Sequence, residues 1–167
     1  MTDLPSPALL RTEVDVVLAD WAWHLDHHDY EAVASLFTED ALFVTGAVEL
    51  RGRSAIRNRY TERAQVRSTR HTYSGLRVSP VPGRTATVPG SAGEHVRVVT
   101  MVRAWSTWVN FAANAAAPVD DVGVYLVADF EDVLVSAASA DGRRWYIAER
   151  RIIPVFRDPS RAPELGA

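Results

Sequence analysis

The sequence contains no cysteine, and all 18 of its basic residues are arginines, so lysine is absent too. Without cysteine, the chain can form no disulfide, no thiolate nucleophile and no cysteine-bound zinc or iron–sulfur centre. Without lysine, it has no side chain that could form a Schiff base, anchor pyridoxal phosphate or complete a phosphate-binding loop. We therefore expect a protein that works without a cofactor and without a bound metal.

An excess of positive charge and a long apolar run are also missing. The formal net charge is −3, whereas nucleic-acid-binding proteins usually carry a basic excess on one face. No apolar stretch reaches the roughly 18 residues that a membrane-spanning helix needs. The N-terminal segment lacks the charged start and apolar run of a signal peptide. The expected protein is cytoplasmic and binds neither nucleic acid nor a membrane.

Positive charge is nevertheless concentrated between residues 51 and 70, where seven arginines are opposed by Glu62 alone. Their mixed three- and four-residue spacing places several of them on one side of a helix, which predicts a solvated face. A surface for a partner is the alternative. The seven are Arg51, Arg53, Arg57, Arg59, Arg63, Arg67 and Arg70.

The length and composition are those of one globular domain. Hydrophobic residues make up 47% of the 167 residues and charged residues 23%, which is close to the average for such domains. A chain of this size buries about two-thirds of the surface that its unfolded form exposes, enough to enclose a pocket. We expect a single domain over 1–167, with its core at about 8–156 and flexible ends.

Three helices are expected in the first third of the chain. Apolar residues at three- and four-residue spacing predict a helix over 8–27. Asp29 is the expected N-cap of a second, shorter helix that continues to Phe37. Ser54 is expected to cap a third helix that ends near Arg63.

The rest of the chain is rich in Val, Ile, Thr, Tyr and Trp, which predicts strands. Strands much longer than the usual five or six residues have to bend to stay within one domain. We therefore predict an α+β fold in which a strongly curved, mostly antiparallel sheet wraps the helices. The predicted strands are 41–44, 47–50, 70–82, 94–110, 121–136 and 143–156.

Three segments interrupt this pattern. Residues 85–93 form a loop of small residues, and 110–118 are an alanine-rich insert that is either a surface loop or a lid. The tail after Arg157 is expected to fray.

Asp26 and His71 are the leading catalytic candidates. Asp26 lies beside the apolar face of the first predicted helix, where a buried carboxylate needs a partner. His71 opens the first long strand, and if its ring points to the helices, a hydrogen bond to Asp26 would fix its tautomer and raise its basicity. Such a pair is a general base near neutral pH. A buried structural histidine and a solvated aspartate are the alternative.

Four segments carry a resemblance to a known family: WAWHLDHHDYEAVASLFTEDALF, LRGRSAI, RHTYSGLRV and DGRRWYIAERRI. Together they resemble the SnoaL-like, scytalone dehydratase-like branch of the nuclear transport factor two-like superfamily, over roughly residues 10–156. The resemblance implies a cone-shaped α+β domain with a deep apolar pocket. It also implies that Asp26 and His71 occupy the positions of the acid–base dyad of the dehydrating members.

The sequence departs from that family pattern at two points. Trp21 stands five residues before Asp26, where several dehydrating members carry tyrosine or lysine. A second catalytic histidine has no clear match, since His95 sits at the start of the next predicted strand. Candidates for binding substrate oxygen are Tyr30, Tyr73 and Arg150, and Tyr73 shares a strand face with His71 by two-residue alternation.

Tryptophans are the remaining candidates for ligand binding. Trp23, Trp105 and Trp108 would form an aromatic wall suited to a ring-containing or polyketide-like ligand, together with Trp21. Ordinary core packing is the alternative for each of them. A metal site within His24–Asp29 is a weaker alternative, because no third ligand stands at a known spacing.

The leading hypothesis is a cofactor-independent lyase or isomerase, of the dehydratase or cyclase type, that moves a proton on a small hydrophobic substrate. The resemblance leaves two other functions open, because the fold also serves as the small, non-catalytic subunit of aromatic-ring-hydroxylating dioxygenases and as a ligand-binding protein. It further implies a homo-oligomer, a dimer or a trimer.

Overall fold

Three helices, six strands and a short 3-10 turn make up the described part of the chain. The computed structural model describes residues 5–62, 66–81, 100–139 and 142–162. The helices are α1 (Pro7–Asp26), α2 (Tyr30–Ser35) and α3 (Arg53–Thr61). The strands are β1 (Phe37–Thr45), β2 (Val48–Arg51), β3 (Ser68–Pro80), β4 (Met101–Ala113), β5 (Gly123–Ser139) and β6 (Gly142–Arg157), followed by the turn η1 (Pro159–Arg161).

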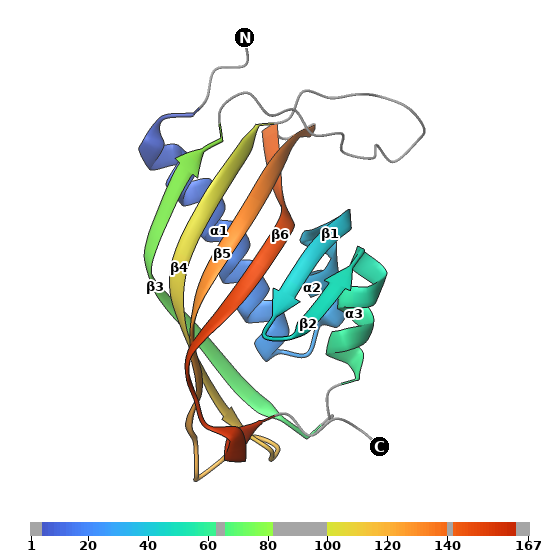
Figure 1. Cartoon of the computed structure of the whole chain (residues 1–167), viewed down its shortest axis with the longest axis vertical. Coiled ribbons are helices and arrows are strands. Elements are labelled where there is room, and N and C mark those ends of the chain that lie inside the picture. Colours follow the sequence, from blue (N-terminus) through green and yellow to red (C-terminus); the bar gives the residue numbers. More distant parts are fainter. Residues whose placement is uncertain (1–4, 63–65, 82–99, 140–141, 163–167) are drawn as a thin grey trace.

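The strands form one sheet in the order β2-β1-β6-β5-β4-β3. All neighbours are antiparallel except β1 and β6, which run parallel. Register shifts interrupt the pairing of β3 with β4, of β4 with β5 and of β5 with β6, and such bulges bend strands. Figure 1 shows the four long strands curving past α1. The predicted α+β class, with a mostly antiparallel curved sheet, is confirmed.

Helix α1 lies against the inner side of the sheet. Its first turn is capped by Ser6, whose hydroxyl accepts a hydrogen bond from the Leu9 N–H at 3.3 Å, and Pro7 occupies the first turn, where no N–H is needed. Trp21 is the largest side chain that α1 buries, and it packs edge-on against Trp108, with ring centroids 5.2 Å apart. The other buried apolar residues of α1 are Leu10, Val14, Val17, Leu18, Ala22 and Leu25.

A bulge in β6 decides which of its side chains reach the core. Trp145 and Ile147 are buried before the bulge, and Arg150 is buried after it. The register shift between the pairs Val133–Glu149 and Leu134–Ile147 places one extra residue on β6. Because side chains alternate along a strand, the extra residue turns even-numbered positions inward. The inward position of Arg150 is a consequence of this bulge.

The predicted boundary at Phe37 is wrong. Helix α2 ends at Ser35, and Phe37 already belongs to β1, which therefore starts before the predicted strand 41–44. The reason is pairing with β6, since the Ile147 N–H donates to the Leu36 carbonyl at 2.8 Å and Phe37 pairs with Ile147. Tertiary strand pairing here outweighs the helical spacing of the apolar residues.

The predicted cap of α3 is also wrong. Gly52, not Ser54, is the N-cap, and no side chain accepts a hydrogen bond from the first turn. Gly52 has a φ of 88°, in the left-handed region that favours glycine, and its N–H donates to the Ala41 carbonyl at 2.8 Å. The third helix itself was predicted, and it ends at Thr61.

The alanine-rich insert 110–118 is divided between a strand and an exposed loop. Its first four residues complete β4, where Ala112 and Ala113 pair with Thr69 and Ser68. Residues 114–118 are exposed and contain the cis peptide bond between Ala117 and Pro118. The first part of the insert therefore belongs to the sheet, and only residues 114–118 form a loop.

The tail after Arg157 is ordered as far as 162. Arg161 forms ion pairs with Asp121, just before β5, at 3.2 Å and with Asp158, the N-cap of η1, at 3.5 Å. The predicted loop 85–93 lies outside the described residues, and so does the start of the predicted strand 94–110 with His95.

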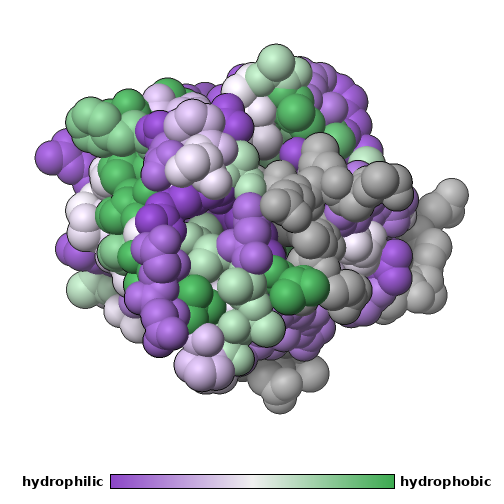
Figure 2. Space-filling model, turned by 90° about the horizontal axis from the view of Figure 1, so that it is seen from below, coloured by the Kyte–Doolittle hydropathy of each residue, from purple (hydrophilic) through white to green (hydrophobic). Residues whose placement is uncertain are grey.

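Within the described residues, no helix is both long and apolar enough to cross a bilayer. Seen from below, the surface presents apolar side chains between hydrophilic ones (Figure 2). The molecule therefore has apolar surface at this end.

Candidate functional site

Asp26 ends helix α1 with its carboxylate against strand β3. Its Oδ1 accepts a hydrogen bond from the Thr69 hydroxyl at 2.8 Å, and its Oδ2 accepts one from the His71 backbone N–H at 2.8 Å. The Nδ1 atom of His71 lies 2.6 Å from Oδ1. The side chain of Asp26 is 6% exposed and that of His71 is 5% exposed. The structure thus brings the two leading candidates together in a buried contact.

The environment of Asp26 fixes the tautomer of His71. Burial by itself would raise the pKa of the Asp26 carboxyl, but the hydrogen bonds and charge of His71 and the hydroxyl of Thr69 outweigh burial and hold that pKa below its ordinary value. Asp26 is therefore ionised at neutral pH and can only accept. Nδ1 of His71 must therefore carry the proton of this hydrogen bond. In a neutral ring, the lone pair that can accept a proton is then on Nε2.

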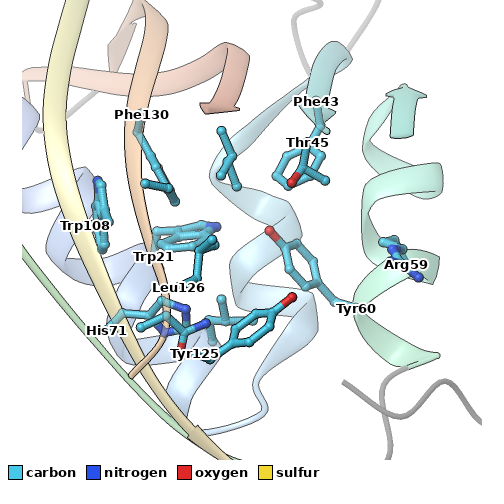
Figure 3. Close-up of a pocket in the computed structure, with 14 residues that line it drawn as sticks. Trp21, Phe43, Thr45, Arg59, Tyr60, His71, Trp108, Tyr125, Leu126 and Phe130 are labelled. Carbon is cyan, nitrogen blue, oxygen red and sulfur yellow. The ribbon is translucent and has the colours of Figure 1, made fainter. Parts of the chain in front are cut away.

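A cavity of about 110 Å³ lies beside this pair (Figure 3). Its volume is similar to that of engineered protein cavities of roughly 150 Å³ that bind benzene. Rings dominate its wall, and among them Trp108 and Phe130 stack with centroids 4.9 Å apart. The lining residues are Trp21, Leu25, Phe43, Thr45, Arg59, Tyr60, His71, Trp108, Asn110, Tyr125, Leu126, Ala128, Phe130 and Ile152. The predicted apolar pocket is present.

Two polar lining atoms lack a hydrogen-bond partner among the described residues: Trp21 Nε1 and Asn110 Oδ1. Asn110 is 8% exposed and pairs in register with His71 on the neighbouring strand. A buried polar atom without a partner costs free energy unless a ligand or water satisfies it. Sequence reasoning missed Asn110, although its position two residues after Trp108 placed it on the same strand face.

Tyr73 lies where alternation placed it, on the same face of β3 as His71. Its ring stacks on Trp108 at 4.5 Å, and its hydroxyl donates to Asp15 Oδ1 at 2.7 Å. Burial, followed by the hydrogen bond and charge of Asp15, raises the pKa of the Tyr73 hydroxyl above its ordinary value. Tyr73 does not line the cavity, and it supports Trp108 from behind.

Tyr30 and Arg150 also lie outside the cavity lining. The hydroxyl of Tyr30 is 2.8 Å from His28 Nδ1, and its ring stacks on Tyr60. Arg150 is fully buried, and its guanidinium donates two hydrogen bonds of 2.8 Å to Asp132. Both residues therefore contact side chains that line the cavity, Tyr60 and Trp21, without lining it themselves.

Trp23 and Trp105 are not part of the aromatic wall, which corrects the prediction from sequence. Trp23 is 64% exposed and stacks on His27. Trp105 faces the other side of the sheet, among the charged side chains of Arg103 and Glu131. Both positions follow from geometry, because two helical residues two apart point in different directions and two strand residues three apart face opposite sides. The wall consists of Trp21, Trp108 and phenylalanines instead.

The histidines near the end of α1 are held by neighbouring groups. His24 Nδ1 lies 3.5 Å from Asp29 Oδ2, and His27 Nδ1 lies 2.7 Å from the Trp23 carbonyl. Within the described residues, no three His, Asp or Glu side chains are grouped as a metal site.

The arginines between 51 and 70 do not form one solvated face. Arg53 pairs with Glu39, and Arg57 pairs with Glu31. Arg67 is buried, and its guanidinium lies over the Tyr125 ring. Arg59 lines the cavity. The prediction of a common solvated face is therefore wrong for Arg59 and Arg67.

Several solved structures share this fold. ActVI-ORFA from Streptomyces coelicolor is 19% identical, with a TM-score of 0.67 over 87% of this chain and 97% of that chain. A candidate scytalone dehydratase from Novosphingobium aromaticivorans is 17% identical, with a TM-score of 0.64 over 90% of this chain and 87% of that chain. At these identities the similarity shows the fold alone.

A third structure has a different kind of role. The beta subunit of a candidate aromatic-ring-hydroxylating dioxygenase from Novosphingobium aromaticivorans is 15% identical, with a TM-score of 0.63 over 90% of this chain and 92% of that chain. No curated protein matches the sequence significantly. The model of the SnoaL-like domain matches residues 6–151. The chain therefore belongs to the SnoaL-like domain family, within the nuclear transport factor two-like fold that its sequence resembles.

Proposed function

We propose that the protein is a cofactor-independent lyase or isomerase, of the dehydratase or cyclase type, with His71 as its general base and acid. The observation that carries the proposal is the 2.6 Å contact between His71 Nδ1 and Asp26 Oδ1 at the wall of the cavity. A base must be oriented and polarised to work near neutral pH, and a buried carboxylate does both.

The proposed step starts with a proton next to a carbonyl or conjugated system of the substrate. Nε2 of His71 removes this proton, and the ionised carboxylate of Asp26 stabilises the imidazolium that forms. In a dehydration, the carbon–carbon double bond forms as the carbon–oxygen bond breaks, and the imidazolium returns the proton to the leaving hydroxyl as water. In a cyclisation, the carbanion attacks a second carbonyl and the proton goes to the new alkoxide. Neither route needs an oxidant or a metal.

The shape of the cavity supports a small substrate with a ring. The stacked rings of Trp108 and Phe130 offer a flat apolar surface, and Trp21 crosses both of them edge-on. Such walls favour planar apolar groups and exclude water from the reacting atoms. The similarity in fold to a candidate scytalone dehydratase supports the same class of reaction.

Solvent exchange tests the base without knowledge of the natural substrate. Cyclic β-hydroxy ketones such as 3-hydroxycyclohexanone are incubated with the protein in D₂O, and both loss of the α-proton and formation of the enone are followed by NMR. We expect His71→Ala to lower the rates of α-proton loss and of enone formation by about 10²- to 10⁴-fold, the usual contribution of a general base. His27→Gln, an exposed histidine at the end of α1, is the control and should keep the rate. A folded His71→Ala protein with full activity would contradict the proposal.

A second candidate function is a non-catalytic subunit of a larger oxygenase. It is favoured by the similarity in fold to the dioxygenase beta subunit and by apolar side chains exposed near the end of β6, where Phe156 is 69% exposed. This alternative expects a stable complex with a large iron-containing chain, whereas a stand-alone enzyme is expected as a homodimer or homotrimer. Affinity purification followed by light scattering distinguishes the two.

A further inference from the structure

The cavity has a strongly uneven distribution of charge. Arg59 is its one permanently charged lining residue, and no carboxylate lines it within the described part of the chain. Asp26 is not among the lining residues, and its carboxylate already accepts three hydrogen bonds. A neutral ligand would leave this positive charge without a counter-charge, whereas an anionic ligand would supply one.

Arg59 differs from the neighbouring arginines in its partners. Arg51, Arg53 and Arg57 each form an ion pair with a glutamate. Among residues 5–62, 66–81, 100–139 and 142–162, the side chain of Arg59 has no hydrogen bond and no ion pair. Its side chain is only half-exposed, in contact with the cavity, on the helix that also supplies Tyr60 to the wall. Of the four arginines between residues 51 and 59, the one whose side chain lacks a carboxylate partner is thus the one that borders the cavity.

A second observation points independently to a ligand with polar groups. The amide of Asn110 is more than nine-tenths buried, lines the same cavity beside His71, and its Oδ1 has no partner within the described residues. Figure 3 shows His71 and Arg59 on opposite sides of the cavity, with Tyr60 and the aromatic rings between them. Polar groups therefore stand at both ends of an apolar chamber.

We propose that the pocket selects an anionic substrate, a small apolar carboxylic acid whose carboxylate is bound by Arg59 and whose reacting end is placed between Asn110 and His71. Only the placement of the reacting end beside His71 rests on the proposed function, whereas binding of the carboxylate by Arg59 does not. The cavity of about 110 Å³ limits the apolar part to about one ring. The planar guanidinium can hold a carboxylate through two parallel hydrogen bonds, which a lysine cannot do.

Asn110 is a positioning residue in this arrangement. Its unpartnered amide oxygen accepts a hydrogen bond from a hydroxyl of the ligand, which would hold that hydroxyl next to His71. Asn110→Ala should therefore weaken binding of a hydroxy acid more than binding of the matching acid without the hydroxyl. A purely structural role would weaken both equally.

Binding of matched ligands tests the proposal separately from catalysis. The probes are benzoate and cyclohexanecarboxylate with their neutral isosteres benzamide and cyclohexanecarboxamide, at neutral pH, where both acids are ionised. Tryptophan fluorescence reports occupancy, because Trp21 and Trp108 line the cavity. We expect wild type to prefer the anions by about 10-fold or more, the range for a charge-assisted hydrogen bond. Arg59→Gln should remove the preference, and Arg59→Lys should restore part of it.

Arg57→Gln is the matched control, because Arg57 lies on the same helix but is paired with Glu31. It should keep the preference for anions. Equal binding of acid and amide by wild type would overturn the proposal, and so would a preference that survives Arg59→Gln or failure of every acid to bind at millimolar concentration. None of these outcomes depends on turnover. A loss of the exchange activity in His71→Ala with unchanged acid binding separates the two proposals.

Discussion

Two buried pairs, each made of a basic and an acidic side chain, lie on the inner side of the sheet, and they differ in what surrounds them. Arg150 and Asp132 are held by two hydrogen bonds and are closed in by rings, since Trp21 covers the guanidinium at 4.4 Å and Phe130 at 5.0 Å. The side chains of His71 and Asp26 are also buried, at 5% and 6% exposure, but His71 borders a cavity. Burial and pairing are therefore common to both sites, and access to a cavity is what separates the site that we propose for chemistry from the one that supports the fold.

The two pairs also differ in how completely the protein satisfies them. Asp26 accepts hydrogen bonds from three donors, which compensate its burial at the end of a helix, where the helix dipole disfavours a negative charge. In the other pair, Arg150 Nη1 has no hydrogen-bond partner among the described residues and lies among aromatic rings. The buried arginine is tolerated because these rings and Asp132 stabilise its charge.

Breaking the structural pair should have the largest effect on stability. Asp132→Ala leaves the Arg150 guanidinium buried without its counter-charge, which typically costs about 3–5 kcal/mol. Urea unfolding followed by circular dichroism measures the change in the free energy of unfolding. The double variant Asp132→Leu with Arg150→Met should recover most of the loss. A single variant that loses less than about 1 kcal/mol would show that the pair does not hold the core.

Breaking the pair at the cavity should affect activity more than stability. Asp26→Asn removes the charge that orients His71, and we expect activity to fall by about 10²- to 10⁴-fold and stability by about 1.5–3 kcal/mol. Thr69→Val is the control, since it removes one donor to the same Oδ1 atom and leaves the His71 contact. Activity that falls equally in both variants would mean that Asp26 acts only as a structural link between α1 and β3.

The pH dependence of stability should show the lowered pKa of the Asp26 carboxyl. Its pKa is lowered in the folded protein from the unfolded value of 3.8, so its stabilising contribution is complete above the unfolded pKa. That contribution is lost as the pH falls through the lower folded pKa. The difference in unfolding free energy between wild type and Asp26→Asn should therefore shrink as the pH falls below about 4. Parallel curves across the whole acid range would contradict a lowered pKa.

The smallest effect is expected at Trp23. Trp23→Ala removes an exposed ring and should change stability by less than about 0.5 kcal/mol, without an effect on ligand binding. Trp21→Ala, two residues away on the same helix, should cost about 3–5 kcal/mol because it empties the centre of the core. Similar decreases in the melting temperature of the two variants would contradict the structure, in which one tryptophan is buried and the other exposed.

The fold and the central contact were predictable to different degrees. The spacing of apolar residues predicted α1, and the β-branched and aromatic segments predicted the four long strands, because both patterns are local. The contact of Asp26 with His71 came from their positions in a recognised family pattern, since no local pattern joins the end of a helix to a strand more than forty residues later. The start of β1 at Phe37 was missed because it depends on pairing with β6.

The rest of the site depends on how the strands and helices meet. Strand alternation would have separated Trp105 from Trp108 and joined Asn110 to Trp108, so that signal was present in the sequence. The burial of Arg150 depends on a bulge that no sequence signal marked. The position of Arg59 at the cavity depends on the packing of α3 against the rest of the fold, which spacing alone does not determine.

The most direct test of the account is the tautomer of His71, measured by ¹⁵N NMR of histidine-labelled protein with and without a bound small acid. We predict a neutral ring with its proton on Nδ1, held by Asp26, and an Nε2 signal that shifts when the ligand fills the cavity. Asp26→Asn should disturb this assignment. A ring protonated on Nε2, or an Nε2 signal that no ligand moves, would contradict the claim that Asp26 holds His71 ready for proton transfer.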